Sequence, residues 1–368
     1  MKHPSRLVIP IALALTAALL FALPAALVSR TRIPGLEGTD RTLLRIWIAS
    51  APGGGQAWLT GRLRTWEKQH PGVMTYLRVV DPSEALAPDA VLPDMILYMP
   101  GDFDAPQELF APLSGSTSIR EPLMRAGRWQ AAQYGMPLCW GGWVLAIDSA
   151  LEPGSAITPA PTTLLGRPAA TAVPSAIPGY PREAATQADC PLQSPGGAAL
   201  LSLMCTLAAE EMPQLPGDLA QLSPAAVYAA FQARQCATAM LTTGQATALT
   251  ALVSGGSGFP FRIMTPTEIV TDQVWLASLT PGASRDAAGL LAFLTDAESQ
   301  QALTSQGLHT VRDDLTLYTS GFSAEVEQAG RRALSAINAY LPLAQVQSAA
   351  WQALQGTCGF SEALLPLL

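Results

Sequence analysis

Histidine and cysteine, the side chains that most often bind metals or act as catalytic bases and nucleophiles, are few and scattered along this chain. The only histidines are His3, His70 and His309, and no two of them stand at metal-ligand spacing. The five cysteines form no C-x-x-C pair, and their odd number excludes complete internal pairing. These cysteines are Cys139, Cys190, Cys205, Cys236 and Cys358. We therefore expect no metal site and no bound cofactor.

Motifs of the common hydrolases and nucleotide-binding enzymes are absent from the sequence. It contains no G-x-S-x-G and no P-loop, and Gly255-Gly256-Ser257-Gly258 continues with Phe259 where a nucleophile elbow needs glycine. A glycosidase needs a pair of carboxylates, and nothing in the sequence singles out one pair such as Asp102 and Glu268. We therefore interpret the protein as a non-enzyme.

Composition and charge restrict the class of partner. The formal net charge is −7, only 13% of the residues are charged, and no basic stripe occurs. Nucleic acid is therefore not an expected partner. With 49% hydrophobic residues, the chain of 368 residues has enough apolar surface to bury the cores of two domains.

An uncharged apolar run at residues 7–28 begins the chain, with Lys2 and Arg6 before it and Arg30 and Arg32 after it. Its length matches the roughly 20 residues of a membrane-spanning helix. A cleaved export signal has a shorter apolar centre, about 7–15 residues, and ends in small residues. Both an uncleaved membrane anchor and a cleaved signal peptide remain open, and both predict that the protein leaves the cytoplasm.

The spacing of apolar residues after this run predicts a strand at 44–49, a helix at 56–69, and further strands at 73–79 and 95–98. Strand, helix and strand with such short connections form a βαβ unit, so we expect a parallel sheet. Farther along, the apolar run 138–147 predicts one central strand. Two strands at 236–241 and 274–279 and a long amphipathic helix at 323–341 follow in the second half.

Several short segments occur in an order that is typical of one protein family. They are Trp66-Glu67-Lys68-Gln69-His70-Pro71-Gly72-Val73, Pro93-Asp94-Met95-Ile96, Ala111-Pro112-Leu113, Tyr134-Gly135-Met136-Pro137 and Asp296-Ala297-Glu298-Ser299-Gln300. Each motif alone has low specificity. In number and order over residues 43–368, they resemble the extracellular solute-binding proteins of ABC importers, of the maltose and oligosaccharide type.

The chain also departs from that family at identifiable positions. The strand of the second lobe ends in Ile147-Asp148 where the family has Tyr-Asn, and the next motif reads Pro161-Thr162-Thr163-Leu164 without its usual Trp. No cysteine closely follows the apolar run, so attachment through a processed N-terminal cysteine is excluded. The sequence thus indicates a divergent member.

The resemblance implies an α/β fold of two lobes like that of periplasmic binding proteins. Each lobe is expected to hold a mostly parallel sheet flanked by helices, with a cleft between the lobes, and the chain is expected to cross between them near 136–138, 258–261 and 309–312. The expected parts are a signal peptide or anchor at 1–32, a linker at 33–42, a first lobe at 43–136 plus 261–309, and a second lobe at 137–260 plus 310–368.

Ligands of such folds sit beyond the carboxyl ends of strands, where aromatic rings stack on sugars and polar groups bind hydroxyls. From their positions in the fold that the resemblance implies, we expect eight residues to bind the ligand. They are Ser50, Gln56, Trp58, Asp102, Trp140, Trp143, Phe259 and Phe261. Structural roles compete at most of them: core packing for Trp58 and Trp143, hinge packing for Phe259 and Phe261, and a solvated carboxylate for Asp102.

The function implied by the resemblance is capture of a small solute, a sugar or oligosaccharide, for an ABC importer. The expected partners are that solute, the permease subunits and, through the N-terminal helix, the membrane. The expected location is outside the cytoplasm, either secreted or membrane-anchored. The alternative is a divergent binding-protein fold that acts as an extracytoplasmic sensor or structural partner without transport.

Overall fold

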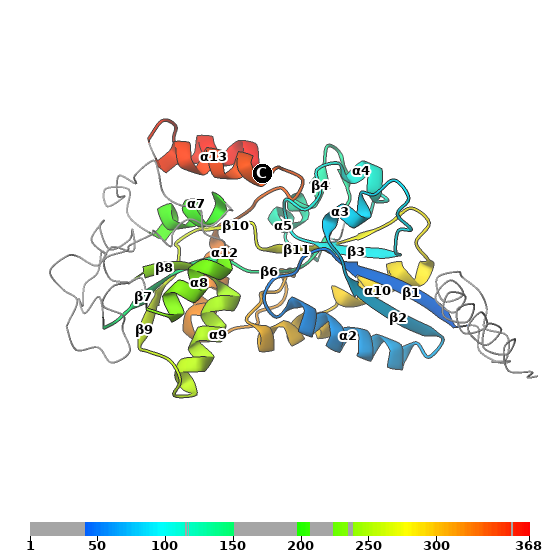
Figure 1. The fold of residues 1–368 in the computed structure, drawn as a ribbon, viewed down its shortest axis with the longest axis horizontal. Coiled ribbons are helices and arrows are strands. Elements are labelled where there is room, and N and C mark those ends of the chain that lie inside the picture. The colour runs from blue at the N-terminus through cyan, green and yellow to red at the C-terminus, as the bar shows by residue number, and fades with distance from the viewer. Residues whose placement is uncertain are drawn as a thin grey trace, which may run out of the picture.

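The computed structural model describes residues 41–114, 116, 118–150, 197–206, 224–234, 238–354 and 356–368. This part of the chain forms two lobes that lie side by side, joined by strands that pass through the middle of the molecule (Figure 1). The apolar run 7–28, almost all of the linker 33–42 and the motif at 161–164 lie outside the described residues. Within the described residues, no helix is both long and apolar enough to cross a membrane.

The first lobe begins with the predicted βαβ unit. Strand β1 (Thr42–Ile48) is followed by helix α2 (Gly55–Gln69) and strand β2 (Val73–Val79), and β3 (Met95–Tyr98) comes next. β1 pairs in parallel with both β2 and β3, as the short connections predicted. The apolar face of α2 supplies the buried Leu59, Leu63 and Trp66 to the core beneath the sheet.

Two strands from later in the chain complete this sheet. Its order is β2-β1-β3-β11-β6, where β6 is Met136–Trp140 and β11 is Val274–Leu279. β11 runs antiparallel to both of its neighbours. Helix α10 (Arg285–Leu294) lies beside α2 on the lower side in Figure 1, with α3 (Pro82–Ala85), α4 (Pro106–Leu109) and α5 (Glu121–Ala126) on the upper side. A short hairpin, β4 (Arg128–Trp129) and β5 (Ala132–Gln133), follows α5.

The second lobe contains a smaller sheet, in the order β8-β7-β9. Its strands are β7 (Trp143–Asp148), β8 (Thr238–Thr242) and β9 (Phe261–Met264), and both pairings are antiparallel. The expectation of a mostly parallel sheet is therefore wrong for this three-stranded sheet. Around the sheet lie the helices α7 (Gly197–Thr206), α8 (Pro224–Gln232), α9 (Thr243–Ser254), α13 (Leu343–Leu354) and α14 (Phe360–Leu364).

The apolar run 138–147 is not one strand, as predicted from its hydrophobicity, but two. β6 ends at Trp140 in the first sheet, and β7 begins at Trp143 in the second. Gly141 and Gly142 separate them; Gly141 N–H donates to the Gln273 carbonyl and Gly142 N–H to the Thr243 hydroxyl. The chain therefore crosses between the lobes at these glycines, where a Cβ on Gly141 would lie 2.9 Å from the Thr243 hydroxyl oxygen.

The predicted crossing at 258–261 is wrong, because β9 pairs with β7 and lies inside the second lobe. The chain returns instead between β10 (Ile269–Thr271) and β11. The predicted long helix at 323–341 is also shorter, since α12 (Gly321–Arg332) ends where β12 (Leu334–Ala336) begins to pair with β10. In the structure, parallel pairing with β10 satisfies the backbone groups that the predicted helix would have satisfied internally.

The segment of residues 297–312 follows α10 and pairs with the end of β6. Helix α11 (Ala297–Gln301) continues as a 3₁₀ turn (Ala302–Gln306), and Gly307 ends it at φ 68°, the left-handed conformation of a C-cap glycine. Trp140 and His309 then exchange two backbone hydrogen bonds of 3.1 and 2.8 Å. A last 3₁₀ turn (Leu365–Leu367) follows α14 and ends against the core of the second lobe.

Candidate ligand-binding site

Two polar loops follow the carboxyl ends of neighbouring parallel strands, and they are bound to each other. Ser50 lies after β1 and Asp102 after β3, and the Ser50 hydroxyl donates to the Asp102 carboxylate. The Met99 N–H donates to both the Ser50 hydroxyl and the Asp102 carboxylate at 2.9 Å. Burial raises the pKa of Asp102, and the hydrogen bond from Ser50 opposes this rise. The predicted pair of cleft loops therefore forms one polar edge of the first lobe.

The second lobe lies directly against this edge. The Gly101 N–H donates to the Ala339 carbonyl at 2.8 Å. A Cβ on Gly101 would lie 2.6 Å from Cγ of Leu343, at the start of α13. On the α9 side, a Cβ on Gly244 would lie 3.4 Å from the Gly53 carbonyl oxygen, and one on Gly307 2.4 Å from the Thr247 hydroxyl. We call these contacts the interlobe seam, and they show that the two lobes touch.

Tryptophans stand behind the polar edge rather than on its surface. Trp275 is fully buried and donates its indole N–H to the Ser50 carbonyl at 2.8 Å. Trp58 meets the Trp275 ring edge-on, with 6.2 Å between centroids, and donates to the Ser299 carbonyl at 2.9 Å. Only 4% of Trp58 is exposed, so its ring supports the loop and does not form a free wall. Gln56, in the first turn of α2, is exposed.

Trp140 and Trp143 are buried where the chain crosses between the lobes. Trp140, 0% exposed, stacks on His309 with 4.6 Å between centroids and donates to the Thr310 carbonyl at 2.8 Å. Trp143, 1% exposed, donates to the Asp272 carboxylate at 2.8 Å. Neither indole presents a face to a ligand in this arrangement of the lobes, because both rings are buried.

Phe259 and Phe261 lie away from the seam, contrary to the cleft position that the sequence suggested. Phe261 pairs with Asp148, at the end of β7 opposite to Trp143. Both rings pack around Phe231, at 5.4 and 6.4 Å between centroids, and the Arg234 guanidinium lies 5.1 Å from the Phe259 ring centroid. These phenylalanines therefore form a small apolar cluster within the second lobe.

A residue that sequence reasoning missed holds the crossing segments together. Gln300 is fully buried and makes four hydrogen bonds with its amide: its N–H₂ donates to the Leu138 and Leu294 carbonyls, and its oxygen accepts from Thr310 and Val311. It thereby ties β6 to the segment that leaves the first lobe. In the sequence, nothing marks Gln300 as a structural tie except its place at the end of the motif Asp296 to Gln300.

Tyr340 also lacked a signal, because the residues around it were expected to be helical. It reaches from the segment before α13 into the first lobe, where its hydroxyl lies 2.7 Å from that of Tyr98 at the end of β3. The Tyr98 hydroxyl lies 2.8 Å from the Ser278 hydroxyl as well. This buried network fixes the Tyr340 segment against the first lobe on the same side as Gly101.

The seam can bind polar ligands but offers no metal chemistry. Ser50, Asp102 and the exposed Gln56 provide hydroxyl, carboxylate and amide groups, which suit the hydroxyls of a sugar. No group of three histidine, cysteine or acidic side chains is placed to hold a metal ion within the described ranges. The seam contacts at Gly101 and Gly244 lie beside this polar edge.

Comparison with known proteins finds similarity to solved structures, and the examples described below are all sugar-binding proteins. Neither a protein-family model nor a curated protein matches the chain. Among solved structures, CpMnBP1 with mannotriose bound is similar at a TM-score of 0.55 and 13% identity, covering 89% of this chain and 99% of that one. The GacH receptor of Streptomyces glaucescens, solved with acarbose, has a TM-score of 0.54 and 14% identity over 88% of this chain and 96% of its own.

A third example is the ABC substrate-binding protein Lmo0181 from Listeria monocytogenes in complex with cycloalternan. It has a TM-score of 0.54 and 12% identity, and the similarity covers 89% of this chain and 97% of that protein. Each of these likenesses spans both lobes. The chain therefore has the two-lobed α/β fold that these sugar-binding proteins share.

Proposed function

We propose that the protein is a solute-binding protein that captures a sugar or oligosaccharide between its lobes and delivers it to an ABC importer. The observation that carries this proposal is the fold similarity over 88–89% of the chain to proteins solved with mannotriose, acarbose and cycloalternan. The motifs from Trp66 to Gln300 support it, because they occur in the order that this class of protein has.

In this proposal, the polar edge formed by Ser50 and Asp102 binds hydroxyl groups of the sugar, and Gln56 extends it. The carboxylate accepts hydrogen bonds from hydroxyls, and charge-assisted bonds of this kind are about twice as strong as neutral ones. Capture then requires the seam at Gly101 and Gly244 to open and close again, which is a hinge motion about the crossing strands. Gly141 and Gly142 are the backbone positions that permit it.

The location that follows from this function is outside the cytoplasm. The apolar run at residues 7–28 serves as an export signal or as a membrane anchor in this proposal. The partners are the permease subunits of the importer, which receive the solute when the closed protein docks. Sequencing the N-terminus of the mature protein distinguishes anchor from cleaved signal.

Thermal melting with candidate sugars tests the proposed function. Mannotriose, maltotriose and cycloalternan are added to the purified protein, each in large excess. A ligand at about 100 times its dissociation constant stabilises the folded state by about 2.7 kcal/mol, which raises the melting temperature by several degrees. If no sugar in a broad panel shifts the melting temperature, capture for import is wrong and the sensor or structural role takes its place.

A further inference from the structure

A cavity of about 390 Å³ lies between the lobes and shares no lining residue with the polar edge. On one side it is lined by Arg125 of α5 and Arg128 and Trp129 of β4; on the other it is lined by Asn338, Leu341 and the last residues of the chain. Its volume falls within the range of about 300–1,000 Å³ that small-molecule sites have. The cavity is therefore large enough for a small organic ligand.

The two sides of the cavity belong to different lobes. Arg125 adjoins Ala126 and Arg128 adjoins Trp129, and both of these neighbours pack in or against the core of the first lobe, whereas Leu341 and Leu368 pack against the core of the second. One direct bond spans the cavity wall: the Asn338 side-chain amide donates to the Arg128 carbonyl at 2.8 Å. A ligand in the cavity consequently contacts both lobes.

Two arginines give the cavity a positive charge, and one of them has no acidic partner in the described part of the chain. Arg125 is exposed and has no ion-pair or hydrogen-bond partner among the described residues. Arg128 lies 3.3 Å from the Glu121 carboxylate, but both side chains of this pair are well exposed, and such pairs contribute at most about 1 kcal/mol. No acidic side chain lines the cavity. An anion therefore meets two guanidinium groups and no acidic side chain in the wall, while Arg128 also pairs with Glu121 outside the lining.

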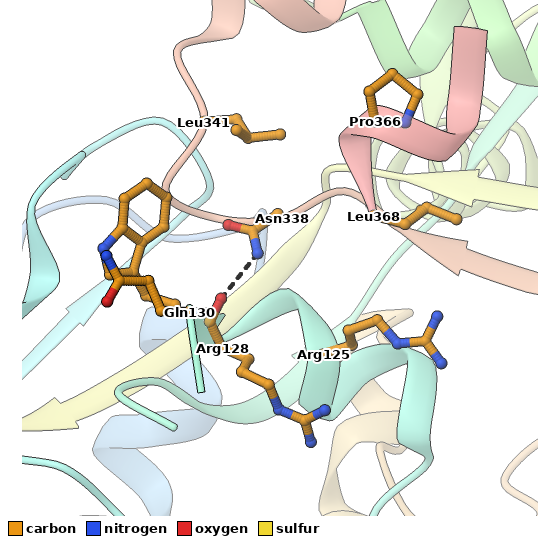
Figure 2. Close-up of a pocket in the computed structure, with 8 residues that line it drawn as sticks. Arg125, Arg128, Gln130, Asn338, Leu341, Pro366 and Leu368 are labelled. Carbon is orange, nitrogen blue, oxygen red and sulfur yellow. Dashed lines mark hydrogen bonds between the residues drawn. The ribbon is translucent and has the colours of Figure 1, made fainter. Parts of the chain in front are cut away.

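Much of the remaining wall of the cavity is apolar. Figure 2 shows the Arg125 and Arg128 side chains below and to the right, and Leu341 and Pro366 above them. Trp129 is half-buried and meets the Tyr340 ring edge-on at 6.1 Å between centroids, which holds its indole in place. Tyr340 itself is anchored by its bond to Tyr98. The wall thus combines fixed aromatic and aliphatic surface with cationic groups.

We propose that this cavity is a second binding site, for a small organic anion with a carboxylate on an apolar or aromatic body. A guanidinium group matches a carboxylate with two parallel hydrogen bonds, which favours carboxylate recognition by arginine. The apolar body of the ligand packs on Trp129, Leu341 and Pro366. Because the ligand contacts both lobes, its binding favours the lobe arrangement seen here and couples to events at the seam.

Calorimetric titration of the full chain with 3-phenylpropionate tests the site, with uncharged 3-phenylpropanamide as the matched probe. The acid is expected to bind one to one and the amide at least about ten-fold more weakly, since it lacks the charge. Arg125→Gln and Arg128→Gln are each expected to weaken the acid about ten-fold. Arg285→Gln, an exposed arginine of α10 away from the cavity, is expected to leave the affinity unchanged.

Three results overturn the proposal: no binding of the acid, equal binding of acid and amide, or equal affinity in the Arg125, Arg128 and Arg285 variants. Melting temperatures equal to that of the parent protein establish that each variant is folded, and both arginines are at least partly exposed, so folding is not expected to suffer. Sugar binding is tested separately at the polar edge, so failure of either site leaves the other intact.

Discussion

His309 is the most unusual titratable residue near the crossing segments. Its ring is fully buried between Trp140 and Tyr318, and neither ring nitrogen has a hydrogen-bond partner among the described groups. Burial, and secondarily the positive charge of Arg120, lower the pKa of His309 from 6.5 to about 3. The folded protein therefore holds a neutral imidazole as an aromatic packing group.

This histidine predicts a pH-dependent loss of stability. Between a pH of about 6.5 and about 3, the unfolded chain binds a proton at His309 that the folded chain does not, so the free energy of unfolding falls as the pH falls. His309→Phe keeps the ring contacts and removes this part of the slope. Urea unfolding of both proteins across this range measures the difference.

Asp102 and Asp272 act in the opposite direction, but they leave the comparison between the two proteins valid. Burial raises the pKa values of Asp102 and Asp272, so their contribution to stability grows as the pH falls. Both carboxyls are present in parent and variant, and the difference between the two proteins isolates His309. Parallel stability curves for the parent and His309→Phe proteins contradict the assignment.

Removal of the Gln300 side-chain amide is expected to lower the free energy of unfolding strongly. Gln300→Leu removes four buried hydrogen bonds and leaves backbone groups of Leu138, Leu294 and Val311 without their partner, which is expected to cost about 2–4 kcal/mol of unfolding free energy. Gln301→Leu, the same substitution at the exposed neighbour, is the control and is expected to change stability by less than about 0.5 kcal/mol. Equal stabilities of the two variants in urea unfolding refute the role of Gln300 as the tie between crossing segments.

At the scale of elements, local patterns predicted the first lobe well. β2, β3 and β11 have the bounds that alternation and apolar runs predicted, and α2 begins one residue early. These elements are specified by spacings of a few residues within each segment. The apolar run 138–147 predicts one strand where β6 and β7 lie, because hydrophobicity does not distinguish a continuous strand from two strands in different sheets. The two glycines between Trp140 and Trp143 were the available signal, since glycine inside a strand pattern marks a break.

The close contact between the Gly101 loop and α13 predicts that a larger side chain at Gly101 lowers stability and separates the lobes. Gly101 and Gly282 have similar left-handed φ values, 92° and 84°, so alanine strains both backbones by about 1–2 kcal/mol. Only at Gly101 does the new Cβ meet a neighbour, Leu343 at 2.6 Å, whereas nothing lies within 4 Å at Gly282. Gly101→Ala is therefore expected to destabilise more than Gly282→Ala and to push α13 away from the first lobe.

Urea unfolding compares the two variants, and small-angle X-ray scattering measures the separation of the lobes. We expect a larger radius of gyration for Gly101→Ala than for Gly282→Ala, because only the first substitution acts at the interlobe seam. Equal losses of stability and equal radii show that the Gly101 contact does not hold the lobes together.

At the scale of the whole molecule, the meeting of the two polar loops was more predictable than the positions of the aromatic residues. Ser50 and Asp102 follow adjacent parallel strands, and the carboxyl ends of such strands meet at one edge whatever the details of packing. The positions of Trp140, Phe259 and Phe261 depend on where the chain crosses between the lobes. That is decided by pairing between distant segments, such as β7 with β9, which no local pattern reveals.

The central claim is that the protein binds a sugar at the polar edge between its lobes. Calorimetric titration with mannotriose, maltotriose and cycloalternan tests it most directly, using Asp102→Ala and, as a control in the same loop, the exposed Asp104→Ala. We predict that at least one sugar binds one to one, about ten-fold or more weakly to Asp102→Ala, and equally well to Asp104→Ala. Absence of binding to the folded parent protein, or equal affinity in both variants, contradicts the claim.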